Sequence, residues 1–356
     1  MDDNINNSTP NISHPASEDR ALTTFRLSNM RAYLHKNMPD EIKDFVEGGR
    51  VKSGYQNLDV VTNMYPGLYV IGAISSLGKT TFIHQMADQM AEAGHPVLFF
   101  SLEQSTLELA TKSLSRIMAK KDASRAMTSL QIRKNGEDLR VQEAICEYDR
   151  YAGNMMVAEC TFRASISTIE DTVLAFIKKY QRKPIVIVDY LQVIQPSIES
   201  HMSAKDLVDM HVRRLKQLQS ENRLVLIVIS SLNRQNYMTQ IDYESFKESG
   251  GIEYTADVVW GLQLEALHDK LFDSQGKINE KRRKVKEAKA ANPRRIELVC
   301  LKNRFGISSY SCMFDYYPQF DFFRPIMEGI DMTLLDVDQD GFIAIPDGFN
   351  FDLPFD

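Results

Sequence analysis

One nine-residue stretch, residues 73–81, constrains the fold of this chain more than any other. It reads Ala-Ile-Ser-Ser-Leu-Gly-Lys-Thr-Thr, follows an apolar run at 68–71 and precedes a helical pattern. A tight loop between a strand and a helix leaves backbone N–H groups free to surround phosphate oxygens. Gly78 lets the backbone approach closely, Lys79 neutralises β- and γ-phosphate charge, and Thr80 offers a hydroxyl to Mg²⁺. The stretch therefore predicts a nucleoside triphosphate site.

The match to the usual pattern G-x-x-x-x-G-K-[ST] departs at its first position, where Ala73 replaces Gly and Gly72 lies one residue too early. The flanking strand and helix supply the missing context. On that helix His84 lies off the apolar stripe, and we expect it to face solvent. The predicted nucleotide-binding residues are Ala73, Ser75, Ser76, Leu77, Gly78, Lys79, Thr80 and Thr81.

Composition is that of an ordinary soluble globular protein. Of the 356 residues, 43% are hydrophobic and 25% charged, which suffices for a packed core in one large or two ordinary domains. No apolar run approaches the ~20 residues that span a bilayer, and the N-terminus lacks the layout of a signal peptide. The four cysteines are widely spaced and show no metal-binding pattern. We therefore expect a cytoplasmic protein with reduced thiols and no membrane partner.

Three further apolar runs deliver polar residues to what we expect to be one sheet edge. Residues 97–100 lead to Glu103, and residues 185–188 lead directly to Asp189. Ligands bind beyond the carboxyl ends of parallel strands. Glu103 could there polarise a water molecule against a γ-phosphate, or only begin the next helix, while Asp189 could hold Mg²⁺. Residues 224–229 are followed by the candidate γ-phosphate sensors Ser231, Asn233 and Arg234.

Cations concentrate in two places although the net charge of the chain is −6. Residues 277–295 hold nine Lys or Arg against two acids, a pattern typical of either a nucleic-acid contact or a solvated helix face. Lys302 and Arg304 follow another apolar run and precede a Gly turn. Such a pair suits phosphate contacts or forms ordinary surface charge, and both interpretations stay open.

The two ends of the chain differ from this core. Residues 1–20 are polar, and we expect disorder there. Residues 27–47 show helical spacing, with a break near Pro39 and an end at Gly48, and they either pack locally or dock on a neighbouring subunit. Residues 326–356 are acidic and aromatic, which favours either a solubilising tail or a peptide that docks on a partner.

Taken in order, these blocks resemble the C-terminal ATPase domain of the bacterial replicative helicase DnaB, a RecA-type motor. The resemblance covers residues 51–323, and the family commonly has Ala at the position of Ala73. Four more blocks carry it: Ser53-Gly54-Tyr55-Gln56-Asn57-Leu58-Asp59; Ser101-Leu102-Glu103; Asp189-Tyr190-Leu191-Gln192; and Lys302-Asn303-Arg304 with Gly306. A fifth block, Lys247-Glu248-Ser249-Gly250, resembles the family's DNA-contacting loop, and Glu253, Ala256 and Asp257 continue it.

The resemblance implies an α/β fold, a RecA-like P-loop ATPase core whose mostly parallel central sheet is flanked by helices. The expected organisation is a disordered N-terminus (1–20), a helical linker that docks on another subunit (21–50), the helicase ATPase domain (51–325) and an acidic tail (326–356). ATP and Mg²⁺ are the implied cofactors. Lys79 and Thr80 would hold phosphate and metal, Asp189 the metal, and Glu103 would activate water.

The resemblance also implies action across subunits. Lys302 and Arg304 would stabilise transition-state charge in trans, so that hydrolysis requires a homo-oligomeric ring, expected to be a hexamer. Lys247, Glu248, Ser249 and Gly250 would hold single-stranded DNA without reading its sequence. Primase, a loader or other replication proteins are the further partners implied.

Two departures from the family shape the expected function. Ser231 stands where the family usually has Gln, which weakens the predicted coupling between nucleotide and DNA. We also expect the family's N-terminal collar domain to be absent, which favours a helicase of a phage, plasmid or other mobile element. Two alternatives stay open: a RecA-type DNA-binding ATPase or loader without processive unwinding, and a weakly active replication scaffold that recruits partners through its tail.

Overall fold

The computed structural model describes residues 29–48, 51–160, 164–195, 202–233, 237–246, 250–272, 276–307 and 309–327. The chain divides into two compact units, residues 1–47 and 48–356, and each is described by itself. Residues 1–20 and all but the first two residues of 326–356 lie outside the described part, so the predictions made for them stay predictions.

Two short helices make up the described part of the first unit, α2 (Met30–Lys36) and α3 (Met38–Gly48). The Asn29 side chain caps α2 by accepting a hydrogen bond from the Ala32 N–H at 3.3 Å. The chain leaves the helix at Asn37 and re-enters it beside Pro39, whose missing N–H is tolerated in a first helical turn. The predicted break and the predicted end at Gly48 are confirmed. Large apolar side chains of both helices are exposed: Met30, Leu34, Ile42, Phe45 and Val46.

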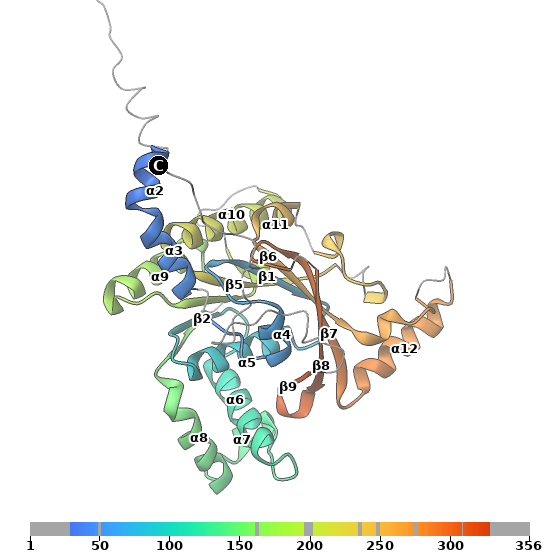
Figure 1. Cartoon of the computed structure of the whole chain (residues 1–356). Helices are drawn as coiled ribbons and strands as arrows, with labels where there is room; N and C mark the ends of the chain where they lie inside the picture. The colour runs from blue at the N-terminus through green and yellow to red at the C-terminus, as the bar shows by residue number, and fades with distance from the viewer. Residues whose placement is uncertain are drawn as a thin grey trace, which may run out of the picture. The chain divides into compact units, whose positions relative to one another are not determined.

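Within the described residues, the second unit is built on a nine-stranded sheet in the order β3-β2-β4-β5-β1-β6-β7-β8-β9 (Figure 1). In this order, each strand from β3 as far as β6 runs parallel to the next one. The pairs β6–β7, β7–β8 and β8–β9 are antiparallel. The predicted mostly parallel sheet is confirmed. The strands are β1 (Gly67–Ala73), β2 (Val97–Ser101), β3 (Met155–Glu159), β4 (Ile185–Asp189), β5 (Val225–Ser231), β6 (Val258–Leu264), β7 (Arg294–Asn303), β8 (Ser311–Tyr317) and β9 (Phe322–Ile326).

Helices cover both faces of the parallel half of the sheet, with α5 on one face and α9 and α10 on the other (Figure 1). This is why β1, β2, β4 and β6 are buried at every residue and read as continuous apolar runs. The helices of this unit are α4 (Gln56–Val61), α5 (Lys79–Glu92), α6 (Thr106–Lys121), α7 (Ser129–Lys134), α8 (Leu139–Ala152), α9 (Ile166–Tyr180), α10 (Ala204–Asn222), α11 (Gly250–Thr255) and α12 (Ile278–Ala290). Short 3-10 turns are η1 (Leu191–Val193), η3 (Tyr243–Ser245), η4 (Glu265–His268) and η5 (Pro318–Phe320).

Helices α6, α7 and α8 carry a small core of their own beside the main one. Its buried members are Leu114, Met118, Met127, Ile132, Val141 and Ala144. Reciprocal caps begin α6 at Ser105 with Glu108 and α7 at Thr128 with Gln131. For residues 105–155 the sequence pattern predicts only mixed helices and loops, and it does not indicate the edge strand β3, whose residues are only partly buried or exposed. A partly exposed strand at a sheet edge lacks the apolar run that marks the central strands.

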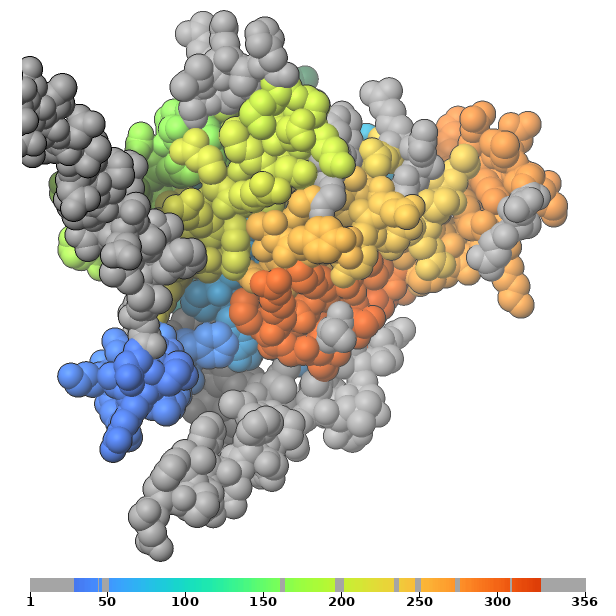
Figure 2. All heavy atoms as spheres, turned by 90° about the horizontal axis from the view of Figure 1, so that it is seen from above, coloured from blue at the N-terminus to red at the C-terminus, as the bar shows by residue number. Residues whose placement is uncertain are grey.

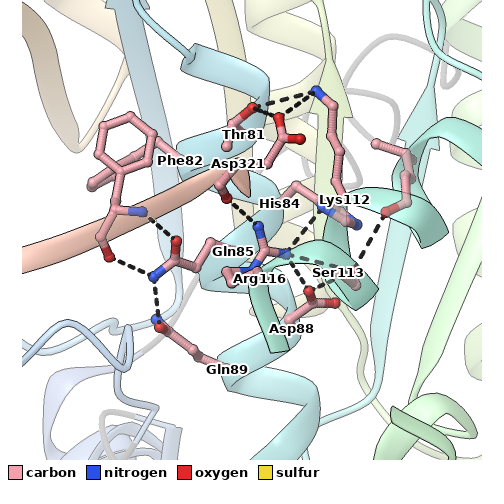
Figure 3. A network of polar contacts seen from close by, with 12 residues as sticks. Thr81, Phe82, His84, Gln85, Asp88, Gln89, Lys112, Ser113, Arg116 and Asp321 are labelled. Carbon is pink, nitrogen blue, oxygen red and sulfur yellow. Dashed lines mark hydrogen bonds and ion pairs between the residues drawn. The ribbon is translucent and has the colours of Figure 1, made fainter. Parts of the chain in front are cut away.

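Two local predictions were wrong. The pattern Ser167-Thr168-Ile169-Glu170 predicts a capping box with its cap at Ser167. Helix α9 instead begins at Ile166 with Ser165 as its cap, because the Ser165 hydroxyl accepts the Thr168 N–H at 3.2 Å. His84 does not face solvent but is 1% exposed. Helix α6 packs over its side of α5, and burial lowers the pKa of His84 to about 3 (Figure 3).

Across the described residues, no helix combines the length and the apolar composition needed to cross a bilayer.

Candidate active site

The phosphate loop joins β1 to the N-terminus of α5, as predicted. Gly78 has φ +89°, a left-handed conformation that favours glycine, and a Cβ there would lie 3.0 Å from the Tyr316 ring. Helix α5 begins at Lys79 without a side-chain cap, so its first N–H groups remain available for an anion. The main-chain geometry of the loop thus fits a bound phosphate group.

Lys79 and the two predicted carboxylates meet at the carboxyl edge of the sheet. Burial lowers the pKa of the Lys79 ammonium, and the charges of Asp189 and Glu103 oppose this effect. The ends of β2 and β4 are held together because the Leu102 N–H donates to the Asp189 carbonyl at 2.8 Å. Glu103 follows at once and is exposed, so its carboxylate can reach a ligand at this edge.

Asp189 is a buried carboxylate that lacks a partner. Its residue is 1% exposed, and neither carboxylate oxygen has a hydrogen-bond partner among the described residues. Burial raises the pKa of Asp189 to about 6, and the nearby Thr80 hydroxyl and Lys79 ammonium oppose this rise. A buried carboxylate of this kind fits a cation ligand, because Mg²⁺ prefers one or two carboxylates together with substrate phosphates. Thr80 and Asp189 therefore suit the predicted metal position.

Of the predicted sensors, Ser231 ends β5 and Asn233 follows it, and both make contacts that the sequence did not predict. The Gln192 amide donates to the Ser230 hydroxyl at 2.8 Å and accepts the Ser231 N–H at 3.1 Å. The Asn233 amide instead donates to the Glu244 carbonyl at 3.1 Å, on the segment that includes η3. Gln192, in η1 just after β4, is thus bonded to the last two residues of β5. Arg234 lies outside the described residues.

Part of the predicted basic segment touches its own phosphate loop, a contact that the sequence did not predict. Lys289 donates to the Ser75 carbonyl at 3.2 Å, and Arg294 donates to the Ser76 carbonyl at 2.8 Å. The Arg294 guanidinium also lies over the Tyr316 ring at 5.5 Å. The rest of α12 buries no residue, and in the space-filling view its orange atoms project at one edge of this unit (Figure 2).

A polar network fixes the other side of α5 to α6 and to the β8–β9 connection (Figure 3). Arg116, 2% exposed, pairs with Asp88 at 2.5 Å and donates to the Asp321 carbonyl at 2.7 Å. The Asp321 carboxylate accepts the Thr81 hydroxyl at 3.3 Å and lies 3.6 Å from the Lys112 ammonium. These contacts join α5, α6 and the C-terminal hairpin into one support beneath the phosphate loop.

Lys302 and Arg304 lie at the opposite end of β1 from the phosphate loop. Arg304 pairs with Asp257 at 3.1 Å, and Asp257 in turn accepts the N–H of Leu68 at the start of β1, 2.8 Å away. Five residue steps along the strand, roughly 17 Å, separate Leu68 from Ala73 at the loop. The Lys302 ammonium donates to a carbonyl of α11 at this same end. Neither cation is therefore placed at the nucleotide site of its own chain.

Of the four predicted DNA-contacting residues, one lies in the described part of the chain. Lys247, Glu248 and Ser249 lie outside the described residues, and Gly250 is the first residue of α11. The next N–H, of Gly251, donates to the Asp209 carboxylate at 3.0 Å and ties α11 to α10.

Comparison with known proteins agrees with this arrangement. The family model "DnaB-like helicase C terminal domain" matches residues 50–323. A probable replicative DNA helicase of Trieres chinensis is 26% identical over 276 residues, covering 75% of this chain and 57% of that protein. Replicative DNA helicase DnaB of Helicobacter pylori is 27% identical over 285 residues, covering 74% of this chain and 57% of that protein. The chain thus spans about half the length of these curated relatives.

Two solved structures share the fold. One is an isolated ATPase domain, which superposes with a TM-score of 0.63 at 21% identity, covering 88% of this chain and all of that one. A DnaB-like replicative helicase, solved in a study of its interactions with primase, gives a TM-score of 0.63 at 20% identity, covering 86% and 70%. Fold, order of blocks and family match agree with the predicted resemblance. The chain therefore belongs to the DnaB-like helicase C-terminal domain family.

Proposed function

We propose that the chain is an ATP-dependent, DnaB-like replicative DNA helicase that forms a ring, a hexamer, and translocates on single-stranded DNA. The observation that carries this proposal is the separation of the phosphate loop from Lys302 and Arg304 along β1. Because the phosphate loop and Arg304 lie at opposite ends of β1, Arg304 cannot reach the nucleotide of its own chain. On this proposal the site is completed by Arg304 of a neighbouring copy. Family membership supports the proposal. We keep, as part of it, the prediction that the helicase belongs to a phage, plasmid or other mobile element.

In the proposed mechanism, the loop N–H groups and Lys79 bind the triphosphate and orient the γ-phosphoryl group. Thr80 and Asp189 would hold Mg²⁺, which supplies positive charge to the phosphate oxygens when bound. Glu103 positions the attacking water and takes up its proton. The Lys302 and Arg304 side chains of the next subunit then balance the charge that develops on the transferred group.

The remaining parts of the chain are assigned on the same proposal. Residues 21–50 would be a linker that docks on a neighbouring subunit, which the exposed apolar residues of α2 and α3 support. Residues 51–325 would be the ATPase domain. Residues 247–250 would hold single-stranded DNA, and the tail (326–356) would recruit primase, a loader or other replication proteins. The expected compartment is the cytoplasm.

ATP turnover across a range of protein concentrations, with and without single-stranded DNA, tests this proposal. We expect turnover per subunit to rise cooperatively with concentration, to increase with DNA and to collapse in Arg304→Ala. Arg283→Ala on α12, assayed without DNA, is the matched control, because it removes an arginine whose side chain is mostly exposed and pairs only weakly with Glu287. Slow turnover that is linear in protein and indifferent to DNA and to Arg304 would contradict a ring motor and favour the scaffold.

A further inference from the structure

Asp257, immediately before β6, joins three parts of the fold through one carboxylate. The residue is 4% exposed. Its Oδ2 accepts the Leu68 N–H at 2.8 Å and the Lys216 ammonium at 2.5 Å, and its Oδ1 accepts the Arg304 guanidinium at 3.1 Å. One oxygen is therefore fixed to β1 and α10, and the other holds Arg304.

Arg304 is anchored at three points and still half exposed. Its backbone N–H donates to the Asp257 carbonyl at 3.1 Å, its Nη1 to the Asp257 carboxylate, and its Nη2 to the Tyr254 carbonyl at 3.5 Å. The side chain is nevertheless 51% exposed. A guanidinium has five N–H donors in a rigid fork, so the anchored ones set its direction while the others remain for a phosphate.

The neighbouring charges make Asp257 necessary to this arrangement. The last carbonyls of a helix lack intrahelical partners. In α11, the Glu253 carbonyl accepts the Lys302 ammonium at 2.5 Å and the Tyr254 carbonyl accepts the Arg304 guanidinium. Burial and the charge of Arg304 lower the pKa of Lys302. The Asp257 carboxylate opposes the effect of the Arg304 and Lys216 charges on Lys302, so removing it leaves the repulsion among these three cations less compensated.

We propose that Asp257 is the positioning residue that aims Arg304 at the nucleotide of the neighbouring subunit. This inference rests on the proposed function, because it needs Arg304 to act in trans. Holding the guanidinium in place before the neighbour's nucleotide arrives removes the cost of ordering a long side chain in the transition state. Asp257 itself touches no substrate and acts through Arg304.

Steady-state ATP turnover of Asp257→Asn, Arg304→Ala and the double variant tests the inference. Asn keeps an acceptor for the Leu68 N–H but loses the charge. We expect Asp257→Asn to lower kcat on the order of 10–100-fold with KM for ATP nearly unchanged, as misaimed catalytic groups do. The double variant should be no slower than Arg304→Ala alone. Independent, multiplicative losses, or full activity in Asp257→Asn, would overturn the inference, whereas full activity in Arg304→Ala would instead overturn the proposed function.

Mixed rings separate positioning from general damage. Asp257→Asn subunits keep an intact phosphate loop, and Lys79→Ala subunits keep an intact Arg304, so mixing the two should raise turnover above either alone. No gain on mixing would place the defect outside Arg304 and overturn the inference.

Two further variants complete the test. Asp315→Asn is the matched control, since Asp315 is 7% exposed and pairs with Arg295 and Arg324 on another part of the sheet. Its turnover should match that of the unchanged chain, and an equal loss there would overturn the inference. If Asp257→Asn does not fold, Arg304→Lys tests the positioning role instead. The lysine keeps the positive charge, but its ammonium cannot reach Asp257 and Tyr254 together. Arg304→Lys should lose nearly as much as Arg304→Ala, and wild-type kcat in that variant would overturn the inference.

Discussion

Two buried aspartates stand at opposite edges of the same sheet, and their surroundings differ completely. Asp189 is 1% exposed, has no hydrogen-bond partner for either carboxylate oxygen among the described residues, and has its pKa raised to about 6 by burial. Asp257 is 4% exposed and is held by Leu68, Lys216 and Arg304. A buried carboxylate without partners suits a ligand from outside the fold, whereas one with three partners suits a support for another residue.

Strand β7 runs between the two edges and has an arginine near each end. At its start Arg294 contacts the phosphate loop of its own chain, and just past its end Arg304 contacts Asp257 instead. Ten residues of one strand therefore place one arginine on the chain's own nucleotide side and another where only a neighbour's nucleotide would reach it. In the proposed ring, position along the strand, rather than residue type, would decide which nucleotide each arginine serves.

The strongest loss of activity is expected at the far end of β7. Arg304→Ala should lower kcat by about 10³-fold or more, as loss of a trans-acting arginine does, because transition-state charge is no longer balanced. Binding of a fluorescent ATP analogue to the same variant should be unchanged, since Arg304 is remote from its own loop. Measuring both on one preparation separates catalysis from binding. Equal loss of nucleotide binding would mean that the two edges are not independent.

Stability distinguishes the two aspartates. Without nucleotide or divalent ions, Asp189→Asn should stabilise the fold at pH 7.5 by up to about 3 kcal/mol, because the ionised carboxylate is buried without a partner. Asp257→Asn should destabilise it, because the partly buried Lys216 ammonium and the Arg304 guanidinium lose their counter-charge. Thermal unfolding monitored by circular dichroism checks both. The same sign for the two variants would mean that the two carboxylates do not differ in role.

The pH dependence of the Asp189→Asn gain follows from the direction of the pKa change. Folding raises the pKa of Asp189 from 3.8 to about 6, so the folded chain binds the proton more tightly than the unfolded chain. The contribution of Asp189 to stability is therefore present below about pH 4 and is lost as pH rises through 6. The advantage of Asp189→Asn should shrink as pH falls from 7.5 toward 5. An advantage that is constant with pH would point to packing rather than ionisation.

The sequence predicted the residues at the carboxyl ends of the parallel strands well, and those at the other ends of the strands poorly, for a physical reason. Buried strands of a parallel sheet are continuous apolar runs, so the polar residues that end them, Glu103 and Asp189, could be assigned to one edge. The partner of Arg304 could not, because Asp257 lies 47 residues earlier and meets it only through the antiparallel pairing of β6 and β7. His84 was misplaced because helix periodicity does not reveal a second helix packed on the polar side.

A more modest change is expected at the near end of β7. Arg294→Ala removes the bond to the Ser76 carbonyl and leaves the phosphate loop less ordered before ATP binds. Ordering it on binding should cost about 1 kcal/mol, so Kd for ATP should rise about 5–10-fold while kcat at saturation changes little. Titration with a fluorescent nucleotide and saturating turnover measure the two quantities. Loss of kcat without loss of affinity would make Arg294 resemble Arg304 and remove the contrast between the two ends.

The weakest change is expected on α12 away from the phosphate loop. Arg283 pairs with Glu287 at 3.6 Å, with both side chains mostly exposed, and such pairs contribute little in water. Arg283→Ala should leave Tm, ATP affinity and kcat unchanged, unlike Lys289→Ala, which removes the contact with Ser75 from the same helix. The salt dependence of single-stranded DNA binding by Arg283→Ala then settles the open interpretation of the basic segment. A slope reduced by about one relative to the unchanged chain would mean that this face of α12 contacts DNA phosphate, and an unchanged slope would identify it as a solvated face.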